Sequence, residues 1–549
     1  MTPIKILSLT SFLIITVLAT PLPAQLLTNP YYMPFDAGRR TLADPPVLPT
    51  QDQMYRFAWD SFIALNWQYE NGAIRGEPDT TAPPIPIFGN APNEASPFVV
   101  WETYFVPPDV FIPNPPSNPN DYPVIWGQPS FLDINTGFRN LIPTNYGPVE
   151  FFAPGINQPY THANVPTGPV SDKNRNYLRY EVTMGQSYFD YVRTFQYYNA
   201  NIQTTVVQNY IDFAWANQAR PPANDTTYFQ PVPNGTEPYV PQTPWAQQGM
   251  VEVKASWRVL SDNDVPQRYF RRLMRLPIPS TNPQQYEDRL MGLTGLHIHR
   301  VTPTGHLPST FEHIDNVKLF KRPGDPLPLP ATPALNPGPK PPFPYHWFKR
   351  FPYLKRFLHY FVAAWNRHYQ NHSSPPYPNG YEVNGLTGQP GIIPPAFLAK
   401  NDPIPPVDQR REINVSRSTP IPKAVQEINR QYQSQLGNSV WRYYQLIGTQ
   451  GLSGTENNPY VTPNNPNLGP GIPNKNLGPG IPGPQYSETT DLVNSTLESY
   501  TQPGWSCARC HINAFPHGVD AFPPYEDYFT PLHVMSFLLL TAHPEAPAP

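Results

Sequence analysis

The stretch Met250-Val251-Glu252-Val253-Lys254-Ala255-Ser256-Trp257-Arg258-Val259-Leu260 has the most regular pattern in this chain of 549 residues. Apolar side chains occupy every second position from Val251 to Val259, and polar or charged side chains occupy the positions between them. Because successive side chains of a β-strand point to opposite faces, this alternation predicts a strand over residues 250–260. It also predicts a sheet with one apolar face on a core and one face toward water.

Two further predicted strands carry side chains that can bind metals. Residues 293–301 include His297 and His299, which share one face of a strand, and residues 310–317 follow after a loop that contains His306. If the two strands pair as a hairpin, several potential ligands converge, so a mononuclear metal site is one hypothesis. The alternative is that these histidines pair with neighbouring carboxylates or lie on a solvated strand face.

Helical periodicity occurs in four places, and one short strand is expected between the first two. Apolar spacing of three and four predicts helices over residues 51–67, 176–199, 353–369 and 419–436. In the last of these, Thr419 is the expected N-cap and Gly437 the expected stop. The run from Val99 to Phe105 precedes two prolines and is predicted to be a strand.

The composition is unusual for a folded chain. It contains 79 Pro and only 14% charged residues, but also 33 Tyr, 29 Phe and 11 Trp. A high Pro content favours irregular chain, whereas so many aromatic residues indicate a packed core. The sequence therefore predicts an α+β fold with a mixed, loop- and Pro-rich main body.

Charge and motifs argue against several function classes. The net charge is −3, so the sequence gives no reason to expect a nucleic-acid partner or an anionic membrane surface. No Gly-x-Ser-x-Gly nucleophile elbow and no phosphate-binding loop occur in the sequence.

The N-terminus has the features of a secretory signal peptide. Lys5 provides a positive charge, and a mostly apolar run extends from Ile6 to Ala19. Small residues allow cleavage after Ala19 or after Ala24. The apolar run is shorter than the roughly 20 residues that span a bilayer, so the mature chain is expected to have no membrane span and to reside in the periplasm.

A second motif lies close to the C-terminus. Cys507 and Cys510 are the only cysteines of the chain, and His511 follows directly. Cys-x-x-Cys-His is the attachment pattern of c-type haem, in which two thiols bond the porphyrin and the imidazole binds iron. A thioredoxin-like redox pair, half of a zinc site and a short disulfide are the alternatives. Together with the export signal, the motif favours one covalent haem c.

At this motif the chain resembles the c-type cytochromes. The resemblance implies that Cys507 and Cys510 anchor the haem and that His511 is its proximal ligand. In small soluble members of the family the distal ligand is a downstream Met, which here can only be Met535. Alternatives are core packing of Met535, an open site, or a histidine: His517, His533, His543, His297, His299 or His313.

The rest of the chain resembles large secreted bacterial proteins that end in a single haem motif. The resemblance is carried by Phe62-Ile63-Ala64-Leu65-Asn66-Trp67 and by Thr310-Phe311-Glu312-His313-Ile314-Asp315-Asn316. It implies an architecture and no chemistry. The expected organisation is a signal peptide (1–24), a large body (25–450), a Pro/Gly-rich linker with a short repeat (451–486) and a short, mostly helical haem segment (487–549) packed against the body.

These features favour a periplasmic single-haem c-type cytochrome that transfers electrons to or from a redox partner protein or a small-molecule substrate. The alternative is a haem enzyme of the peroxidase, oxidase or oxygenase type, or a gas sensor, with an open distal site in the large body. In the enzyme, His313 with Glu312 or Arg300 nearby would act on bound oxygen or peroxide. Whether the chain is an enzyme is left open by the sequence.

Overall fold

The computed structural model describes part of the chain. The described residues are 30–37, 49–70, 75–86, 96–112, 114–126, 132–133, 138–139, 172–174, 176, 178–219, 221–222, 225–230, 249–277, 286–303, 305–317, 333–335, 420–450, 492, 494–497, 516–518, 538–539 and 542–544. The signal peptide, the expected helix at 353–369, the linker at 451–486, the motif Cys507–His511 and Met535 lie outside them.

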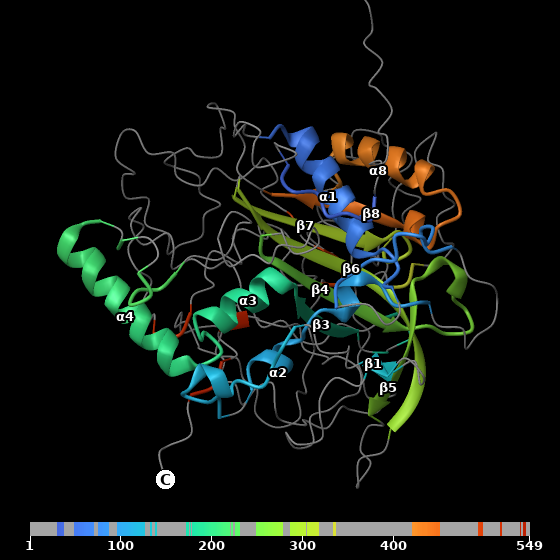
Figure 1. Ribbon diagram of the computed structural model, residues 1–549. Helices are drawn as coiled ribbons and strands as arrows, with labels where there is room; N and C mark the ends of the chain where they lie inside the picture. Colours follow the sequence, from blue (N-terminus) through green and yellow to red (C-terminus); the bar gives the residue numbers. More distant parts are fainter. Residues whose placement is uncertain are drawn as a thin grey trace, which may run out of the picture.

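An antiparallel sheet of six strands organises the described chain, and with the helices it confirms the α+β prediction (Figure 1). The strand order is β3-β4-β6-β7-β8, and β5 pairs with β6. The strands are β3 (Arg179–Met184), β4 (Val251–Val259), β5 (Arg271–Pro277), β6 (Tyr286–Thr302), β7 (Gly305–His313) and β8 (Tyr444–Thr449). A separate two-stranded sheet pairs β1 (Leu132–Asp133) with β2 (Phe138–Arg139).

The helices flank this sheet. They are α1 (Gln51–Leu65), α2 (Pro107–Val110), α3 (Gln186–Thr194), α4 (Ala200–Asn217) and α8 (Lys423–Gln435), with short 3-10 turns at Val100–Thr103, Pro119–Asp121, Pro266–Arg268 and Val440–Tyr443. Helices α1 and α8 lie side by side against β8, whereas α4 projects at the opposite end of the molecule (Figure 1). Helix α1 begins with a capping box between Thr50 and Gln53.

The apolar face of the sheet packs against α1 and α8 through an aromatic core. Trp59 of α1 is fully buried, with its ring 5.1 Å from Phe311 of β7 and stacked on Tyr432 of α8 at 5.2 Å. Its indole N–H donates to Asn429 Oδ1 at 2.9 Å, and the amide of Asn429 donates to the carbonyl of Leu446 at 2.8 Å. One side chain of α8 therefore ties α1 to β8.

A titratable pair lies in the contact between α1 and α8. The hydroxyl of Tyr432 donates to Asp60 Oδ1 at 2.8 Å. Burial raises the pKa of Asp60 to about 7, although the Tyr432 hydrogen bond and the charge of Arg56 oppose this. Between pH 4 and 7 the folded protein thus holds a proton that the unfolded chain has lost, so this group lowers stability as pH rises.

We therefore expect Asp60→Asn to stabilise the protein above pH 7. Asparagine keeps an acceptor for the Tyr432 hydroxyl but carries no charge, so the gain is about 2 kcal/mol at pH 8, roughly half of what a shift of this size is worth. Urea unfolding at pH 4 and pH 8 measures it, and the gain should shrink toward pH 4. Equal stability of the two proteins at pH 8 would contradict the claim that burial disfavours the charged form of Asp60.

Residues 250–260 form the predicted strand, but the prediction of a wet second face was wrong. The side chains of Glu252, Ser256 and Arg258 are only 5%, 0% and 0% exposed. Asp172 and Thr496, from two segments distant in sequence, lie over this face and bond to Arg258 and Ser256 respectively. Segments distant in sequence thus convert a half-exposed sheet into a buried one.

Two local predictions were wrong, the first of them only in its N-terminal half, where pairing with a distant strand prevailed over local periodicity. Instead of a helix over 176–199, β3 pairs along its whole length with β4, and α3 begins only after Gly185. The expected strand at Val99–Phe105 is a 3-10 turn, in which Glu102 accepts a hydrogen bond from the Val99 N–H at 3.1 Å. Helix α4 was not predicted.

The prediction for the last helix was correct in its buried stripe and its end. Val425, Ile428, Tyr432 and Leu436 are buried, and Gly437 follows with a φ of 53°, in the region that favours glycine. The N-terminus differs, since the helix begins after Pro422 with no side-chain cap. The expected capping role of Thr419 was therefore wrong.

Candidate functional site

The predicted histidine hairpin is present, but its second strand begins at Gly305 and ends at His313, so His306 lies on a strand and not on the expected loop. Strands β6 and β7 pair antiparallel, with His297 opposite Thr310 and His299 opposite Pro308. His297 and His299 lie on the same face and are 8% and 4% exposed. Nε2 of His299 lies 3.3 Å from Nδ1 of His306, a hydrogen-bond distance between two imidazoles.

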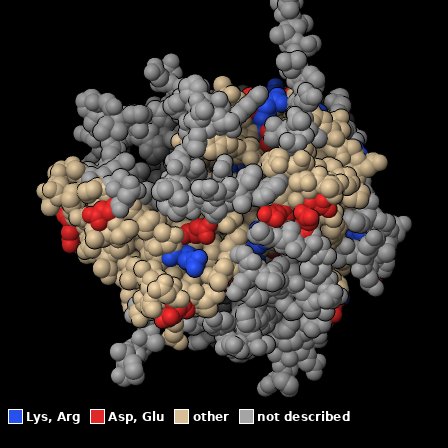
Figure 2. All heavy atoms as spheres, viewed as in Figure 1, with Lys and Arg blue, Asp and Glu red and all other residues tan. Residues whose placement is uncertain are grey.

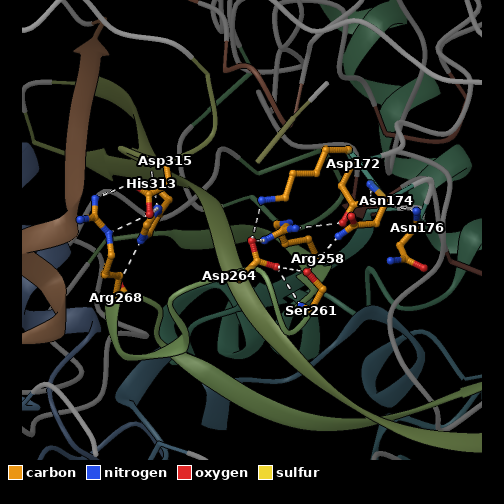
Figure 3. Close-up of polar contacts among 10 residues, drawn as sticks. Asp172, Asn174, Asn176, Arg258, Ser261, Asp264, Arg268, His313 and Asp315 are labelled. Carbon is orange, nitrogen blue, oxygen red and sulfur yellow. Dashed lines mark hydrogen bonds and ion pairs between the residues drawn. The ribbon is translucent and has the colours of Figure 1, made fainter. Parts of the chain in front are cut away.

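His313 lies on the other face of the hairpin, within the cluster that Figure 3 shows beside Arg268 and Asp315. Its Nε2 donates to the Arg268 carbonyl at 2.9 Å, and its Nδ1 accepts the Asp315 N–H at 3.1 Å. The ring stacks on Tyr269 at 3.9 Å. Burial lowers the pKa of His313 to about 4, which outweighs the nearby charge of Asp315, so both nitrogens of a neutral imidazole are used inside the fold.

The histidines do not converge on a metal site in the described part of the chain. There, no three His, Cys, Asp or Glu side chains are close enough together to hold an ion. The nearest approach is the pair formed by His299 and His306. The hypothesis of a mononuclear metal site on this hairpin is therefore not supported, and hydrogen bonding within the fold accounts for His313.

The three residues named for a haem enzyme are not brought together either. Glu312 and His313 are neighbours on β7 and point to opposite faces. Glu312 bonds to Ser495, whereas Nη1 of Arg300 donates to the Pro34 carbonyl at 3.0 Å and to Ser61 at 3.2 Å beside α1. His313 does not support the hypothesis of an acid–base group in the body, because both of its ring nitrogens are already hydrogen-bonded.

The state of His313 predicts an acid-sensitive fold. The folded protein keeps this imidazole neutral while the unfolded chain protonates it near pH 6.5, so stability falls as pH drops from 6.5 to about 4, by about 3 kcal/mol in total. His313→Gln retains a donor and an acceptor. We expect this variant to be less stable at pH 7, and its free energy of unfolding to change less between pH 6.5 and 4 than that of the parent protein. Urea titrations at half-unit pH steps measure the slope, and an unchanged slope would contradict the prediction.

A second buried cluster surrounds Arg258 at the end of β4 (Figure 3). The fully buried guanidinium lies 3.1 Å from Asp172 and 3.0 Å from Asp264, and Lys173 lies 3.1 Å from Asp264. Burial would raise the pKa of Asp264, but Arg258 outweighs it and lowers that pKa to about 2. Two cations thus balance two carboxylates, and the cluster ties the chain at 172–174 to the sheet.

The face of the sheet that bears His297 also receives residues 494–497, which precede the Cys-x-x-Cys-His motif in the sequence. We define the Asn494 seat as the body residues that contact this segment in the middle of the sheet: Tyr180, Ser256, Gly295, Thr310, Phe311 and Glu312. The Asn494 amide donates to Thr310 Oγ1 at 2.9 Å and to the Phe311 carbonyl at 2.8 Å.

The next two residues of the segment complete the contact. Glu312 accepts hydrogen bonds from both the N–H and the hydroxyl of Ser495, the latter at 2.8 Å. The hydroxyls of Thr496 and Ser256 are 2.7 Å apart, and Tyr180 donates to the Thr496 carbonyl at 2.8 Å. Ser495, Thr496 and Glu312 are all 0% exposed.

Two glycines of the sheet make room for this segment. A Cβ at Gly295 would lie 2.8 Å from Ser256 Oγ and closer still to Thr496 Oγ1, and one at Gly448 would lie 2.8 Å from Leu492. Both distances are shorter than real Cβ contacts. The absence of a side chain at these two strand positions therefore leaves room for the close approach of residues 492–496 to the sheet.

A second contact holds the chain just after the motif. The fully buried side chain of Gln203, on α4, accepts the N–H of His517 at 2.9 Å and donates to the Leu539 carbonyl at 3.0 Å. Next to it, the N–H of Ala200 donates to the His543 carbonyl at 3.0 Å. We call these contacts the Gln203 clamp, because one side chain bonds to both His517 and Leu539.

The seat and the clamp bracket the sequence motif. Thr496 precedes Cys507 by 11 residues (507 − 496), and Pro516 follows His511 by five (516 − 511). Cys507, Cys510, His511 and Met535 themselves lie outside the described residues, so the structure shows contacts only for residues that flank the motif. Sequence reasoning identified the motif and missed both holding sites, although isolated glycines within predicted strands are a recognised sign of close approach.

The charged side chains on the described surface form no single-sign patch in the view of Figure 2, where acidic and basic residues are interspersed among uncharged ones. Among the described helices, none has the length and apolar character needed to cross a membrane. Comparison with known protein families, curated proteins and solved structures gave no match.

Proposed function

We propose that this protein is a periplasmic single-haem c-type cytochrome that transfers electrons. The observation that carries the proposal is the motif formed by Cys507, Cys510 and His511, which supplies two thiols and an imidazole in the order that covalent haem attachment needs. Bound haem supplies one-electron redox chemistry at iron. The N-terminal signal is consistent with export to the compartment in which such attachment takes place.

The contacts on either side of the motif support a haem held against the body. In the sequence His511 precedes Pro516 by only five residues, and the next residue, His517, is bonded in the Gln203 clamp. Residues 494–496 are fixed on the sheet upstream. A haem segment that spans 487–549, short and mostly helical, would then share its haem environment with the body rather than form a domain alone.

This arrangement gives the body a role in electron transfer. Burial of the porphyrin and the choice of distal ligand set the reduction potential of a haem. Met535 lies between Leu539 and the motif and is our first candidate for the distal ligand, while the neutral, internally bonded His313 is not a candidate. The partner would be a periplasmic redox protein or a small-molecule substrate.

Optical spectra of protein matured in a periplasm with haem-attachment machinery test the proposal. We expect covalent haem that survives acid–acetone extraction in the wild type and in Ser506→Ala, and loss of at least 90% of it in Cys507→Ala with Cys510→Ala. Ser506 is the matched control because it precedes the motif and lacks a thiol. Absence of covalent haem from the wild type would refute the proposal.

The same spectra separate the carrier from the alternatives. A closed, low-spin iron whose reduced spectrum does not change with CO is expected of an electron carrier. A high-spin spectrum that shifts with CO would instead indicate an open iron site and favour a haem enzyme or a gas sensor. Met535→Ala should convert the closed spectrum into the open one if Met535 is the distal ligand.

A further inference from the structure

The Asn494 seat recognises its segment as a peptide-binding site recognises a ligand. The three polar side chains Asn494, Ser495 and Thr496 are fully buried and all are hydrogen-bonded to the seat. The body also bonds to main-chain groups of the segment, since Glu312 accepts the Ser495 N–H and Tyr180 donates to the Thr496 carbonyl. Three consecutive polar side chains that are all buried and all hydrogen-bonded are unusual for a loop, because most loops lie on the surface.

Apolar side chains anchor the segment on both sides of the polar triplet. Leu492 contacts Gly448 of β8 and belongs to the main core. Leu497 packs in a separate small core with Leu178, Tyr180, Val317 and Leu335. Both leucines are almost completely buried, at 2% and 0% exposed. The segment is therefore held by hydrogen bonds at the Asn494 seat and by one buried leucine on each side of it.

The last described residue before the linker and the first one after it lie close together on the sheet. Gln450 ends the described part of the body, with its N–H bonded to the Pro308 carbonyl at 2.9 Å, and Gly448 beside it contacts Leu492. Gln450 and Leu492, the described residues on either side of 451–491, thus lie near each other at the edge of one sheet. The position of Leu492 is determined by its contacts, because a chain of that length imposes almost no direction on its ends.

We propose that the body is a receptor for the protein's own C-terminal piece, residues 487–549, which it holds non-covalently through the Asn494 seat and the Gln203 clamp. The partner is a peptide whose recognised sequence is Leu-x-Asn-Ser-Thr-Leu at residues 492–497, backed by the second contact at Gln203. The linker supplies proximity and no part of the binding site. The complex consequently outlasts a cut in the linker.

A full-length protein with a protease recognition site in place of residues 467–473, the first copy of the short repeat, tests this. After cleavage, we expect the two pieces to co-elute in size-exclusion chromatography at the mass of the uncut monomer. Mass spectrometry of the peak should find both pieces in equal amounts. Separate elution of the pieces would overturn the proposal, and elution at twice the mass would contradict docking within one chain.

Variants of the two contact sites provide the second arm. Asn494→Leu combined with Gln203→Leu removes the four hydrogen bonds that these side chains make between the two pieces, so the cut pieces should dissociate at least a hundredfold faster than in the parent protein. Thr205→Val is the matched control, since this exposed hydroxyl bonds only to the Asn201 carbonyl of its own helix. Unchanged dissociation in the double variant would also overturn the proposal.

These readouts do not depend on the haem. Fragment masses report docking whether or not the cofactor is attached, so a failure here leaves the proposed electron-transfer function untouched. Conversely, absorbance at the haem band should follow the smaller piece if the proposed function is correct.

Discussion

Arg258→Met is expected to lower the free energy of unfolding by about 3–5 kcal/mol at pH 7. The guanidinium is fully buried between Asp172 and Asp264, and Met fills much of its volume without its charge. The loss arises because two carboxylates stay buried without their cation, with only Lys173 near Asp264. Removal of one partner of a buried ion cluster costs far more than the whole cluster contributes.

Urea unfolding of full-length protein measures this effect, and Arg289→Met is its matched control. Arg289 forms an ion pair at 2.8 Å with Glu287, but the two side chains are 50% and 39% exposed. An exposed pair of this kind contributes about 0–1 kcal/mol. A loss in Arg258→Met that does not exceed the loss in Arg289→Met would contradict the assignment of the cluster as a buried tie.

The pH dependence of the Arg258→Met effect provides a further check. In the native protein the pKa of Asp264 is held near 2, so its stabilisation is present above about pH 4 and is lost as pH falls toward 2. Without Arg258, burial dominates and the carboxyl becomes easier to protonate. The difference in the free energy of unfolding between Arg258→Met and the parent protein should therefore become smaller from pH 7 to pH 3. Adding Asp264→Asn to Arg258→Met should restore part of the stability at pH 7.

The Arg258 cluster also explains where sequence reasoning succeeded and failed. The alternation from Val251 to Val259 predicts the strand correctly, because the period of a strand is a local property. The burial of its charged face is not local. The carboxylate of Asp172 comes from a loop 86 residues earlier in the chain, and the hydroxyl of Thr496 comes from 240 residues later. No window of sequence contains both partners.

A similar limit applies to residues 176–199. Leu178, Val182, Tyr188 and Val192 approximate helical spacing, yet Val182 lies on a strand opposite Lys254 and Tyr188 lies on a helix. Each short half can adopt either structure by its own propensity. The edge of β4 decides the outcome because it offers six residues of ladder hydrogen bonds to β3.

The candidate site divides in the same manner. The motif at Cys507, Cys510 and His511 could be read directly, because covalent attachment demands those residues at fixed spacing. The Asn494 seat could not, since its contacts depend on which face of β6 is covered and by what. Gly295 within a predicted strand was the one available sign, and it indicates a close approach without naming the partner.

Trp59→Ala is expected to destabilise the protein by about 3–5 kcal/mol. The ring is fully buried among Phe62, Phe311 and Tyr432, so its removal leaves a cavity between α1, α8 and the sheet. Trp215→Ala is the matched control, because that indole is 47% exposed on α4 and its truncation should cost less than about 1 kcal/mol. Thermal and urea unfolding of both variants measure the difference.

Trp59→Phe separates the packing of the ring from its hydrogen bond. Phenylalanine keeps the stacked contact with Tyr432 but cannot donate to Asn429, which still accepts the Leu446 N–H at 2.9 Å. Because Asn429 keeps that partner, no buried acceptor is stranded, and the loss should be about 1–2 kcal/mol. A loss in Trp59→Phe as large as in Trp59→Ala would mean that the Asn429 bond, rather than the aromatic core, joins α1 to the sheet.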